Sequence, residues 1–343
     1  MKAIKFSAIG KAEIVEISQP APAAKQVRVR VKSAGICHSD IMAFNGQHPY
    51  RVPPVITGHE ASGVIEALGE GVTDVHVGDR VALEPHQGCG QCEFCRQGHY
   101  QVCLDKKLIG VGAWTGVFAE YVVAGEPMCH KIPAGMSHDT GAMIEPYCVG
   151  LHAVRRAGIT SGDSVSILGC GTIGMMTLLS VMQYDPSNVF VTDLSAAKRD
   201  LAVSLGADSA ADPTEKDPVE FVHNATGGKG VDTVFVTAPN KATLNQALRM
   251  CKRRSTVILI ATIPGDTEIT TAEIQLHERM IMGSAMYNHK DYEIAIEQWQ
   301  ENRLEGFEKL VSNRITIADA PEMISELARG DRAEDIKNII NFD

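Results

Sequence analysis

The sequence predicts an α/β protein in which a β-rich first half is followed by a doubly wound parallel sheet. Apolar and polar residues alternate in the first half, most clearly over residues 27–31, as expected of half-buried antiparallel strands. From about residue 160 strands alternate with helices, which is typical of a parallel sheet. A glycine motif at residues 169–174 lies between the first such strand and its helix. A chain of 343 residues is long enough for two domains, each with its own core.

Composition and charge favour a soluble globular protein without a nucleic-acid or membrane partner. Of the residues, 44% are hydrophobic and 22% are charged. No apolar run reaches the ~20 residues that span a bilayer, and the N-terminus lacks the apolar segment of a signal peptide. The net charge of −10 argues against nucleic-acid and anionic-membrane partners, which need clustered Lys and Arg. The nine cysteines are an odd number and partly crowded together, so we expect free thiols or metal ligands in a reducing cytoplasm.

The first candidate site combines Cys37 with the segment Gly58-His59-Glu60-Ala61-Ser62-Gly63. A thiolate and an imidazole are ligands that zinc prefers, and Glu60 or Glu145 could fill a further position or hold a water there. A partly open zinc ion can bind an alcohol oxygen and act as a Lewis acid. Two other interpretations stay open. A single histidine such as His59 is more often a satisfied core residue, and Glu145 could be an acid at a helix N-terminus.

Residues 37–40 follow the end of the first strands and predict the start of a short helix. Ser39 lies two residues beyond Cys37, so its hydroxyl could reach a group on the metal. It could also cap the helix, and the two roles do not exclude each other. Residues 64–81 and 118–123 predict further strands, separated by glycine-containing turns.

A second candidate metal site follows in the same half. Four cysteines with two-residue gaps, closed by one farther along, can converge as thiolates on one tetrahedral zinc ion. They are Cys89, Cys92, Cys95 and Cys103. An iron–sulfur cluster and free thiols are the alternatives, but no further cysteine group points to electron transfer. We therefore expect a structural zinc ion that serves folding.

The second half carries a dinucleotide-binding motif. A buried-type strand at residues 164–168 runs into Gly169-Cys170-Gly171-Thr172-Ile173-Gly174 and then into a helix through residue 181. In this setting the glycines allow a tight turn and the close approach of a pyrophosphate to the helix N-terminus, as in a Rossmann domain. Asp193 ends the next strand, at residues 188–192, where an acid binds the ribose hydroxyls and repels a 2′-phosphate. NAD is therefore expected over NADP, although Lys198 and Arg199 could receive a phosphate.

Further strands are predicted at residues 232–236, 255–260 and 280–283, which brings the parallel sheet to roughly six strands. The tail from residue 289 has amphipathic helical patterns and two strands, at residues 313–317 and 336–342. Periodicity alone does not place this tail in the fold.

Together these motifs resemble those of the zinc-containing medium-chain alcohol dehydrogenases, over the whole chain, and most of all the polyol (sorbitol) dehydrogenase branch, with the threonine 3-dehydrogenases close behind. The similarity is carried by residues 35–40, 58–63, 78–81, 145–153 and 191–196, the four cysteines and the glycine motif. The resemblance implies a GroES-like catalytic domain at residues 1–149, to which residues 290–343 return, and an NAD-binding Rossmann domain at residues 150–289.

The resemblance also implies roles for single residues. Cys37 and His59 would hold the catalytic zinc, with Glu60 and Glu145 exchanging with water, and Ser39 would touch the zinc-bound alcohol and relay its proton. Contacts to NAD are implied for Gly169, Gly171, Thr172, Ile173, Gly174, Asp193, Lys198, Ala261 and Thr262, within or beside residues 260–262, and for residues 284–286.

Two departures from the family pattern bear on the substrate. Met42 stands where many relatives carry a relay histidine, so the proton must leave by another route. Met286, followed by Tyr287, stands where sorbitol dehydrogenases place an arginine, and a thioether cannot make the charge-assisted bonds of a guanidinium. Further candidate pocket residues are His48, Tyr50 and Trp114.

The hypothesis from the sequence is an NAD⁺-dependent secondary-alcohol dehydrogenase with two zinc ions per chain, acting on a polyol, a sugar alcohol or a similar compound. Zinc would lower the pKa of the alcohol, and hydride would pass to the nicotinamide ring. The family is usually dimeric or tetrameric, so a homodimer or homotetramer is expected. The alternatives are a threonine 3-dehydrogenase-like enzyme for an amino alcohol and a non-catalytic NAD-binding protein.

Overall fold

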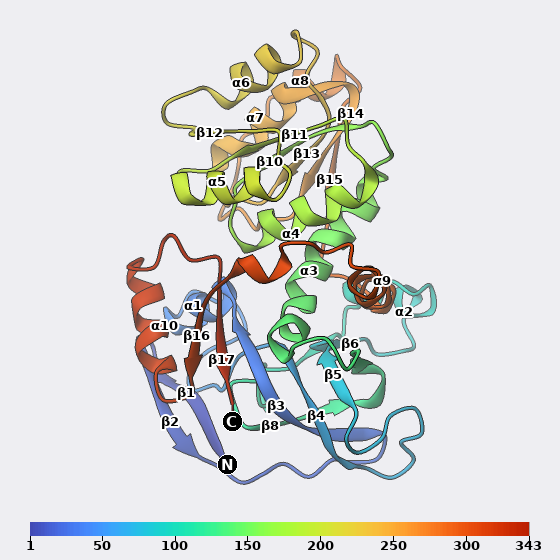
Figure 1. Ribbon diagram of the computed structural model, residues 1–343, viewed down its shortest axis with the longest axis vertical. Helices are drawn as coiled ribbons and strands as arrows, with labels where there is room; N and C mark the ends of the chain where they lie inside the picture. Colours follow the sequence, from blue (N-terminus) through green and yellow to red (C-terminus); the bar gives the residue numbers. More distant parts are fainter. Residues whose placement is uncertain (343) are drawn as a thin grey trace. The chain divides into compact units, whose positions relative to one another are not determined.

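The computed structural model describes residues 1–342, and its chain divides into two compact units. The first comprises Met1–Glu145, Asn288–Glu301 and the C-terminal segment from Glu308. The second comprises Pro146–Tyr287 and Asn302–Phe307. The first is rich in antiparallel strands and the second is a parallel α/β unit, as the sequence predicts (Figure 1).

Within the described residues, a seven-stranded sheet forms the framework of the first unit. Its order is β16-β17-β3-β4-β5-β9, and β8 pairs with β3 off this path. The strands are β3 (Gln26–Ile36), β4 (Glu60–Leu68), β5 (Arg80–Leu83), β8 (Tyr121–Gly125), β9 (Cys129–Lys131), β16 (Val311–Thr316) and β17 (Lys337–Asn341). Two smaller pairs complete the unit, β1 (Lys2–Ala8) with β2 (Lys11–Glu16), and β6 (His86–Gln87) with β7 (Lys107–Leu108).

The alternation over residues 27–31 has the predicted effect. Val27, Val29 and Val31 are fully buried in the core of this unit, and β3 pairs antiparallel with β4, β8 and β17. Arg28, on the other face, is bonded to Glu66 of β4. Burial of one face against a polar opposite face is the pattern of a strand at the edge of a core.

The helices of the first unit are short apart from the one that leads to the second unit. They are α1 (His38–Phe44), α2 (Glu93–Arg96), α3 (His138–Ala157), α9 (His289–Gln300) and α10 (Ala320–Arg329). α3 begins in the first unit and continues beyond Glu145 into the second. The predicted strands of the tail are present as β16 and β17, and β17 joins the first unit by pairing antiparallel with β3.

The second unit contains six described parallel strands in the order β12-β11-β10-β13-β14-β15. They are β10 (Ser164–Leu168), β11 (Asn188–Thr192), β12 (Ser209–Ala211), β13 (Val231–Val236), β14 (Cys251–Leu259) and β15 (Met280–Gly283). The connecting helices are α4 (Thr172–Val181), α5 (Ala196–Ser204), α6 (Pro218–Ala225), α7 (Lys241–Met250) and α8 (Thr271–Gln275), on both faces of the sheet (Figure 1). The winding direction reverses between β10 and β13, and a doubly wound sheet binds its ligand where such a reversal meets the carboxyl ends of the strands.

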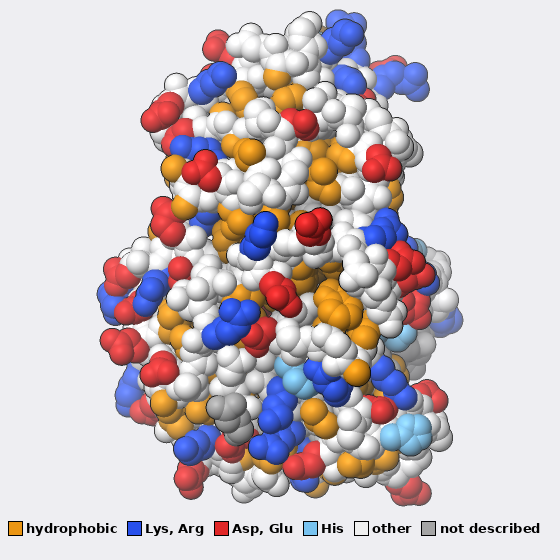
Figure 2. Space-filling view, in the orientation of Figure 1, with side chains coloured by type: hydrophobic (Ala, Val, Ile, Leu, Met, Phe, Trp, Pro, Cys, Tyr) orange, Lys and Arg blue, Asp and Glu red, His pale blue; other side chains and the backbone are white. Residues whose placement is uncertain are grey.

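Acidic and basic side chains are interspersed on the face of the molecule that Figure 2 shows. No helix in the part of the chain that the structure describes is both long enough and apolar enough to cross a bilayer.

Candidate functional site

The fold of the first unit brings Cys37, His59 and Glu60 together. Gly35 in β3 pairs with Glu60 in β4, so the chain leaves β3 at Cys37 beside the start of β4. One ligand atom from each of the three residues lies within 4.8 Å of the other two. His59 and Glu60 are buried and Cys37 is half-buried. A soft sulfur, an imidazole nitrogen and a carboxylate at this separation fit a zinc ion.

Asp40 holds the backbone around this cluster. Its Oδ2 accepts a hydrogen bond from the Cys37 N–H at 3.0 Å, and its Oδ1 accepts from the Thr57 hydroxyl at 2.7 Å and the Gly58 N–H at 3.1 Å. The pKa of Asp40 is lowered well below its usual range, because His59 and other partners outweigh the effect of burial. His59 Nδ1 lies 3.6 Å from Asp40 Oδ1 and has no hydrogen-bond partner among the described residues. The Asp40 carboxylate therefore faces one ring nitrogen of His59, which leaves the other ring nitrogen for a metal ion.

Two glycines are required at this point. Gly58 has φ +89°, in the left-handed region that favours glycine, and a Cβ there would lie 2.4 Å from the Phe118 ring. A Cβ on Gly35 would lie 2.0 Å from Glu60 Oε2. The missing side chains therefore leave the space in which the Glu60 carboxylate lies.

Glu60 has a partner that the sequence analysis did not identify. The Lys337 ammonium, from β17, donates to both oxygens of Glu60, at 2.7 and 2.6 Å, and both residues are fully buried. Glu60, Cys37 and Glu145 raise the pKa of Lys337 although burial opposes the shift. Glu60 would therefore have to share its charge between Lys337 and a metal ion.

Glu145 is not an acid at a helix N-terminus, so that alternative was wrong. It lies within α3, which begins at His138, and Pro146 also lies inside this helix. Its side chain is buried. A buried acid needs a charged or hydrogen-bonded environment. Glu145 lies close enough to Lys337 for its charge to raise the pKa of that lysine, so Lys337 contributes such an environment.

Ser39 lies in the first turn of α1 and does not cap it. The N-cap position belongs to Cys37, and the side chain of Asp40 completes the capping box. The Ser39 hydroxyl instead accepts a hydrogen bond from Arg51 Nη1 at 3.0 Å. Arg51 is buried, and its Nε has no hydrogen-bond partner in the described chain.

The predicted pocket residues of the first unit fall into two groups. His48 and Tyr50 lie beside Arg51: the His48 and Tyr50 rings are 4.4 Å apart, and His48 Nδ1 accepts from the Arg51 N–H. Burial, and then the charge of Arg51, lower the pKa of His48 to about 4, so this imidazole is neutral at pH 7. Trp114 packs against the core of the first unit and donates to the Val123 carbonyl.

The four predicted cysteines converge in the same unit. Their sulfurs all lie within 4.8 Å of one another, with Cys89 and Cys95 separated by 3.9 Å and Cys92 and Cys103 by 3.8 Å. Sulfurs bonded to one tetrahedral zinc ion at about 2.3 Å stand about 3.8 Å apart. The backbone N–H groups of Gln91 and Cys92 lower the pKa of Cys89 to about 6. Burial, among other causes, raises that of Cys95 to about 12, so a cation is needed for all four sulfurs to ionise.

In the second unit the glycine motif has the geometry of a pyrophosphate cradle. Gly169, with φ +104°, follows β10, and Gly171 is the N-cap of α4. A Cβ on Gly174 would lie 1.9 Å from the Gly169 carbonyl oxygen, so the helix packs against the turn only because that side chain is absent. A Cβ on Gly171 would meet no atom within 4 Å, which leaves room for a phosphate beside the helix N-terminus.

Asp193 directly follows β11 and connects the glycine turn to the next helix. Its Oδ2 accepts from the Cys170 N–H at 2.7 Å and its Oδ1 from the Ser195 N–H at 2.9 Å. Arg199 donates to Asp212 Oδ2 and to the Asp193 carbonyl, so its guanidinium is already engaged. Lys198 lies half-buried in the first turn of α5.

The other predicted residues of the second unit lie along the carboxyl edge of its sheet. Thr172 and Ile173 open α4. Ala261 follows β14 and donates its N–H to the Val236 carbonyl, with the exposed Thr262 next to it. After β15, Met286 adopts φ +50°, and Tyr287 is fully buried.

Three residues of these sites had no assigned role in the sequence analysis: Asp40, Arg51 and Lys337. Asp40 was part of a recognised motif, and a carboxylate three residues after an N-cap is the signal of a capping box. Arg51 follows two predicted pocket residues, but nothing local indicates that it is buried. For Lys337, the one signal was the position of a charged residue inside the otherwise apolar final strand.

Comparisons with known proteins agree with this geometry. Residues 23–134 match the model of the alcohol dehydrogenase GroES-like domain, and residues 172–301 match that of the zinc-binding dehydrogenases. The chain is 34% identical to the sorbitol dehydrogenase of Bacillus subtilis (strain 168), over 71% of this chain and 70% of the relative. It is 30% identical to the L-idonate 5-dehydrogenase of Vitis vinifera, over 92% and 88% of the two chains.

Two solved structures show the same fold over nearly the whole chain. One is a zinc-binding dehydrogenase from Sinorhizobium meliloti 1021 bound to NADP, with a TM-score of 0.93, 30% identity and coverage of 99% of both chains. The other, from Escherichia coli CFT073, is complexed with NADH, with a TM-score of 0.92, 29% identity and coverage of 100% and 99%.

Proposed function

The chain belongs to the zinc-binding alcohol dehydrogenase family, and on this premise we propose that it is an NAD⁺-dependent dehydrogenase of small secondary alcohols, namely polyols or sugar alcohols. The observation that carries the proposal is the cluster of Cys37, His59 and Glu60 with Ser39 two residues beyond the cysteine. The proposal includes a homodimer or homotetramer in the cytoplasm, with NAD bound by residues 150–289.

Two zinc ions per chain are proposed, held by different residues. Cys37 and His59 would hold one, with Glu60, Glu145 or water completing its shell. When bound there, zinc supplies a Lewis acid that lowers the pKa of an alcohol. The four cysteines would hold the other, which stabilises the fold and has no open position.

Ser39 is proposed to take the hydroxyl proton of the substrate. Its oxygen accepts from the Arg51 guanidinium, so its own hydrogen remains available for donation. Arg51 is always protonated and cannot accept the proton, and Met42 has no group that can carry one. We therefore propose that the proton passes from Ser39 to water.

NAD is proposed over NADP because of the charges near Asp193. Bound NAD⁺ supplies the hydride acceptor, and the carboxylate of Asp193 would bind its ribose hydroxyls. Arg199 is held by Asp212 and by backbone oxygen, so Lys198 is the cation that remains for a 2′-phosphate. The Asp193 carboxylate would repel a 2′-phosphate and Lys198 would attract it. Because only the carboxylate can also bind the two ribose hydroxyls, we expect NAD to bind more tightly than NADP.

A second candidate substrate class is the sugar acids, and Arg51 favours it. The guanidinium is buried and forms no direct ion pair within residues 1–342, although its charge helps to lower the pKa of Asp40, and its Nε lacks a hydrogen-bond partner. A substrate carboxylate would supply both a charge and an acceptor for the fork of an arginine. One relative is named for such a substrate, L-idonate.

The test is the formation of NADH or NADPH by the zinc-loaded protein with polyols, sugar acids, threonine and simple alcohols. We expect NAD⁺ reduction with a polyol or a sugar acid and loss of turnover in Cys37→Ser. Arg51→Met should raise KM for sugar acids by about 10- to 100-fold, the loss of one charge-assisted bond, and leave KM for polyols within a few-fold. A zinc-loaded protein that oxidises none of these compounds would refute the proposal.

A further inference from the structure

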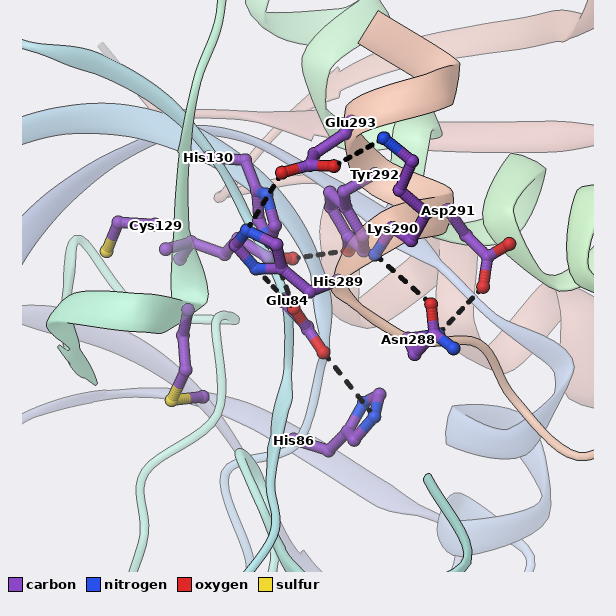
Figure 3. Close-up of polar contacts among 12 residues, drawn as sticks. Glu84, His86, Cys129, His130, Asn288, His289, Lys290, Asp291, Tyr292 and Glu293 are labelled. Carbon is purple, nitrogen blue, oxygen red and sulfur yellow. Dashed lines mark hydrogen bonds and ion pairs between the residues drawn. The ribbon is translucent and has the colours of Figure 1, made fainter. Parts of the chain in front are cut away.

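A third group of metal-ligating side chains lies in the first unit, outside both candidate zinc sites. Glu84 directly follows β5, His130 lies in β9, and His289 is the first residue of α9. One ligand atom from each lies within 4.8 Å of the other two. The three side chains converge from separate elements (Figure 3).

The distances are close to those around a metal ion. His130 Nε2 lies 2.9 Å from Glu84 Oε2, and His289 Nδ1 lies 3.9 Å from the same oxygen. Ligand atoms bound tetrahedrally to one ion at about 2.0–2.2 Å stand about 3.3–3.6 Å apart, so coordination would lengthen the first distance and shorten the second by a few tenths of an ångström. The His289 side chain is 51% exposed, so its ring can turn by the small amount that coordination requires.

Two of the ligands are held by neighbouring aromatic residues. The Tyr292 ring stacks on the His130 ring at 4.2 Å with an angle of 19° between the planes, and the Tyr292 hydroxyl donates to the Leu83 carbonyl. The Tyr100 hydroxyl donates to Glu84 Oε1 at 2.5 Å, which leaves Oε2 directed at His130. Fixed rings and carboxylates are the outer contacts that metal ligands require.

The third ligand has an outer carboxylate of its own. His289 Nε2 lies 3.6 Å from Glu293 Oε1, one turn farther along α9, while Nδ1 faces Glu84. Lys290 pairs with the other oxygen of Glu293 at 2.9 Å. The helix start itself is fixed by a capping box between Asn288 and Asp291 (Figure 3). A histidine between a metal position and a carboxylate is the usual arrangement in metal sites.

A simple hydrogen-bond network explains only part of this group. Glu84, Tyr100 and His130 satisfy one another without an ion. The contacts of His289, at 3.9 and 3.6 Å, are too long for hydrogen bonds, and yet both of its nitrogens face carboxylates. A cation at the His289 Nδ1 side would complete the arrangement.

We propose that Glu84, His130 and His289 bind a divalent transition-metal ion, for which zinc is the best match to two imidazoles and a carboxylate. Because its ligands come from the ends of β5 and α9 and from β9, the ion fastens the start of α9 to the sheet of the first unit. His86, whose Nε2 lies 3.5 Å from Glu84 Oε1, is the nearest further imidazole of this group. The site does not rest on the proposed dehydrogenase activity.

The test starts from protein whose two family sites have been filled with zinc, and adds Co²⁺. We expect one further equivalent of metal, with weak visible cobalt bands and without the near-ultraviolet charge-transfer band of a cobalt thiolate. His289→Ala and His130→Gln should each lose this equivalent and keep the two zinc ions. His130→Gln keeps a hydrogen-bond donor for Glu84, so it guards against loss of folding. His76→Ala is the matched control, because that exposed imidazole also lies near a carboxylate, Asp79.

Metal analysis and circular dichroism distinguish the outcomes. A third equivalent that survives in both His289→Ala and His130→Gln, or that disappears in His76→Ala, would overturn the proposal. So would wild-type protein that binds two equivalents only. A thiolate band with release of zinc would mean that cobalt had exchanged into a cysteine site, and without a further equivalent it would also count against the third site. Since none of these measurements depends on turnover, their failure would leave the dehydrogenase proposal untouched.

Discussion

Lys337 and Glu60 form a buried ion pair between β17 and the candidate zinc cluster. Lys337→Met should lower the free energy of unfolding by about 3–5 kcal/mol, because it leaves the carboxylate buried without its cation. Urea unfolding measures the change. The double variant Lys337→Met/Glu60→Gln should recover part of it. Lys11→Met, at an exposed pair with Glu13, should leave the free energy of unfolding nearly unchanged. Equal costs at the two lysines would contradict the argument.

The preference for NAD is a prediction about Asp193 and its neighbours. Asp193→Ser should lower kcat/KM for NAD⁺ by about 10- to 100-fold, the loss of charged hydrogen bonds to the ribose, and raise it for NADP⁺. Asp212→Asn removes the carboxylate that holds the Arg199 guanidinium. The double variant Asp193→Ser/Asp212→Asn should therefore use NADP⁺ better than Asp193→Ser does. Initial rates with both cofactors provide the measurement. A wild-type enzyme that already prefers NADP⁺ would show that Lys198 outweighs Asp193.

At the residue scale, the sequence alone predicted a site when its residues lie close together along the chain. The four cysteines have a spacing that by itself indicates a tetrahedral cation, and their sulfurs converge as expected. Lys337 lies 277 positions from Glu60, and no local pattern can pair residues across that separation. Its position inside an apolar strand marks it as unusual but does not identify its partner.

At the scale of elements, the cysteine lobe has little packing of its own. The α2 helix is a single turn without buried residues, and the neighbouring 3₁₀ turn Tyr100–Val102 buries only Gln101. Cys92→Ser should therefore release one zinc ion and make residues 89–103 sensitive to proteases, since the metal supplies the order that a core would otherwise supply. Metal analysis with limited proteolysis checks this. Cys251→Ala, at a buried cysteine of β14, should keep both zinc ions, and intact zinc content in Cys92→Ser would refute the assignment.

Asp139, in the first turn of α3, connects three strands of the first unit. It accepts from Ser33 of β3 at 2.7 Å, Asn341 of β17 at 2.8 Å and Arg314 of β16 at 2.6 Å. Burial would raise its pKa, but these donors hold it below the ordinary 3.8. Because the pKa of Asp139 is lower in the folded than in the unfolded chain, its ionised form stabilises the fold at any pH above the ordinary pKa. This contribution is lost as the pH falls through the pKa of the folded state.

The pH dependence of unfolding should reflect this cluster. Asp139→Asn should cost about 1–3 kcal/mol at pH 7 and flatten the fall in stability below about pH 4. Urea midpoints across this pH range provide the measurement. Asp331→Asn, at an exposed pair with Arg329, is the control. An unchanged acid slope in Asp139→Asn would place the acid sensitivity elsewhere.

Strand periodicity predicted most elements of the fold, and the errors have physical causes. β10 and β11 have the predicted bounds. The strand expected from residue 118 begins at Tyr121, because Phe118 and Ala119 pair with β1 instead. β12 has only three residues, too few to show a period. Glu145 followed by a proline also fits a helix start, yet Pro146 lies inside α3, eight residues after its first residue.

At the scale of the whole molecule, each unit has its own hydrophobic core and its own candidate binding sites. The core of the first unit includes Val29, Ile65 and Phe118, and that of the second includes Val234 and Val257. Both candidate zinc clusters belong to the first unit, and the glycine motif with Asp193 belongs to the second. The change of period near residue 160 predicts two structural classes, but which segments of the tail join the first unit depends on the pairing of β17 with β3.

This division predicts that metal and nucleotide act on different thermal transitions. Removing metal with a strong chelator should lower the transition of the first unit, because its two clusters lose the cations that hold their thiolates. NAD⁺ at about 100 times its Kd should raise the free energy of unfolding of the second unit by about 2.7 kcal/mol, because only the folded unit binds it. The transition temperature of that unit should rise accordingly. Calorimetry of the zinc-loaded, chelated and NAD⁺-bound protein separates the effects, and Cys37→Ser/Cys92→Ser serves as the control without zinc at the two cysteine-containing clusters. If a single transition responded both to NAD⁺ and to the chelator, the two units would have to unfold as one cooperative body, and the prediction would be wrong.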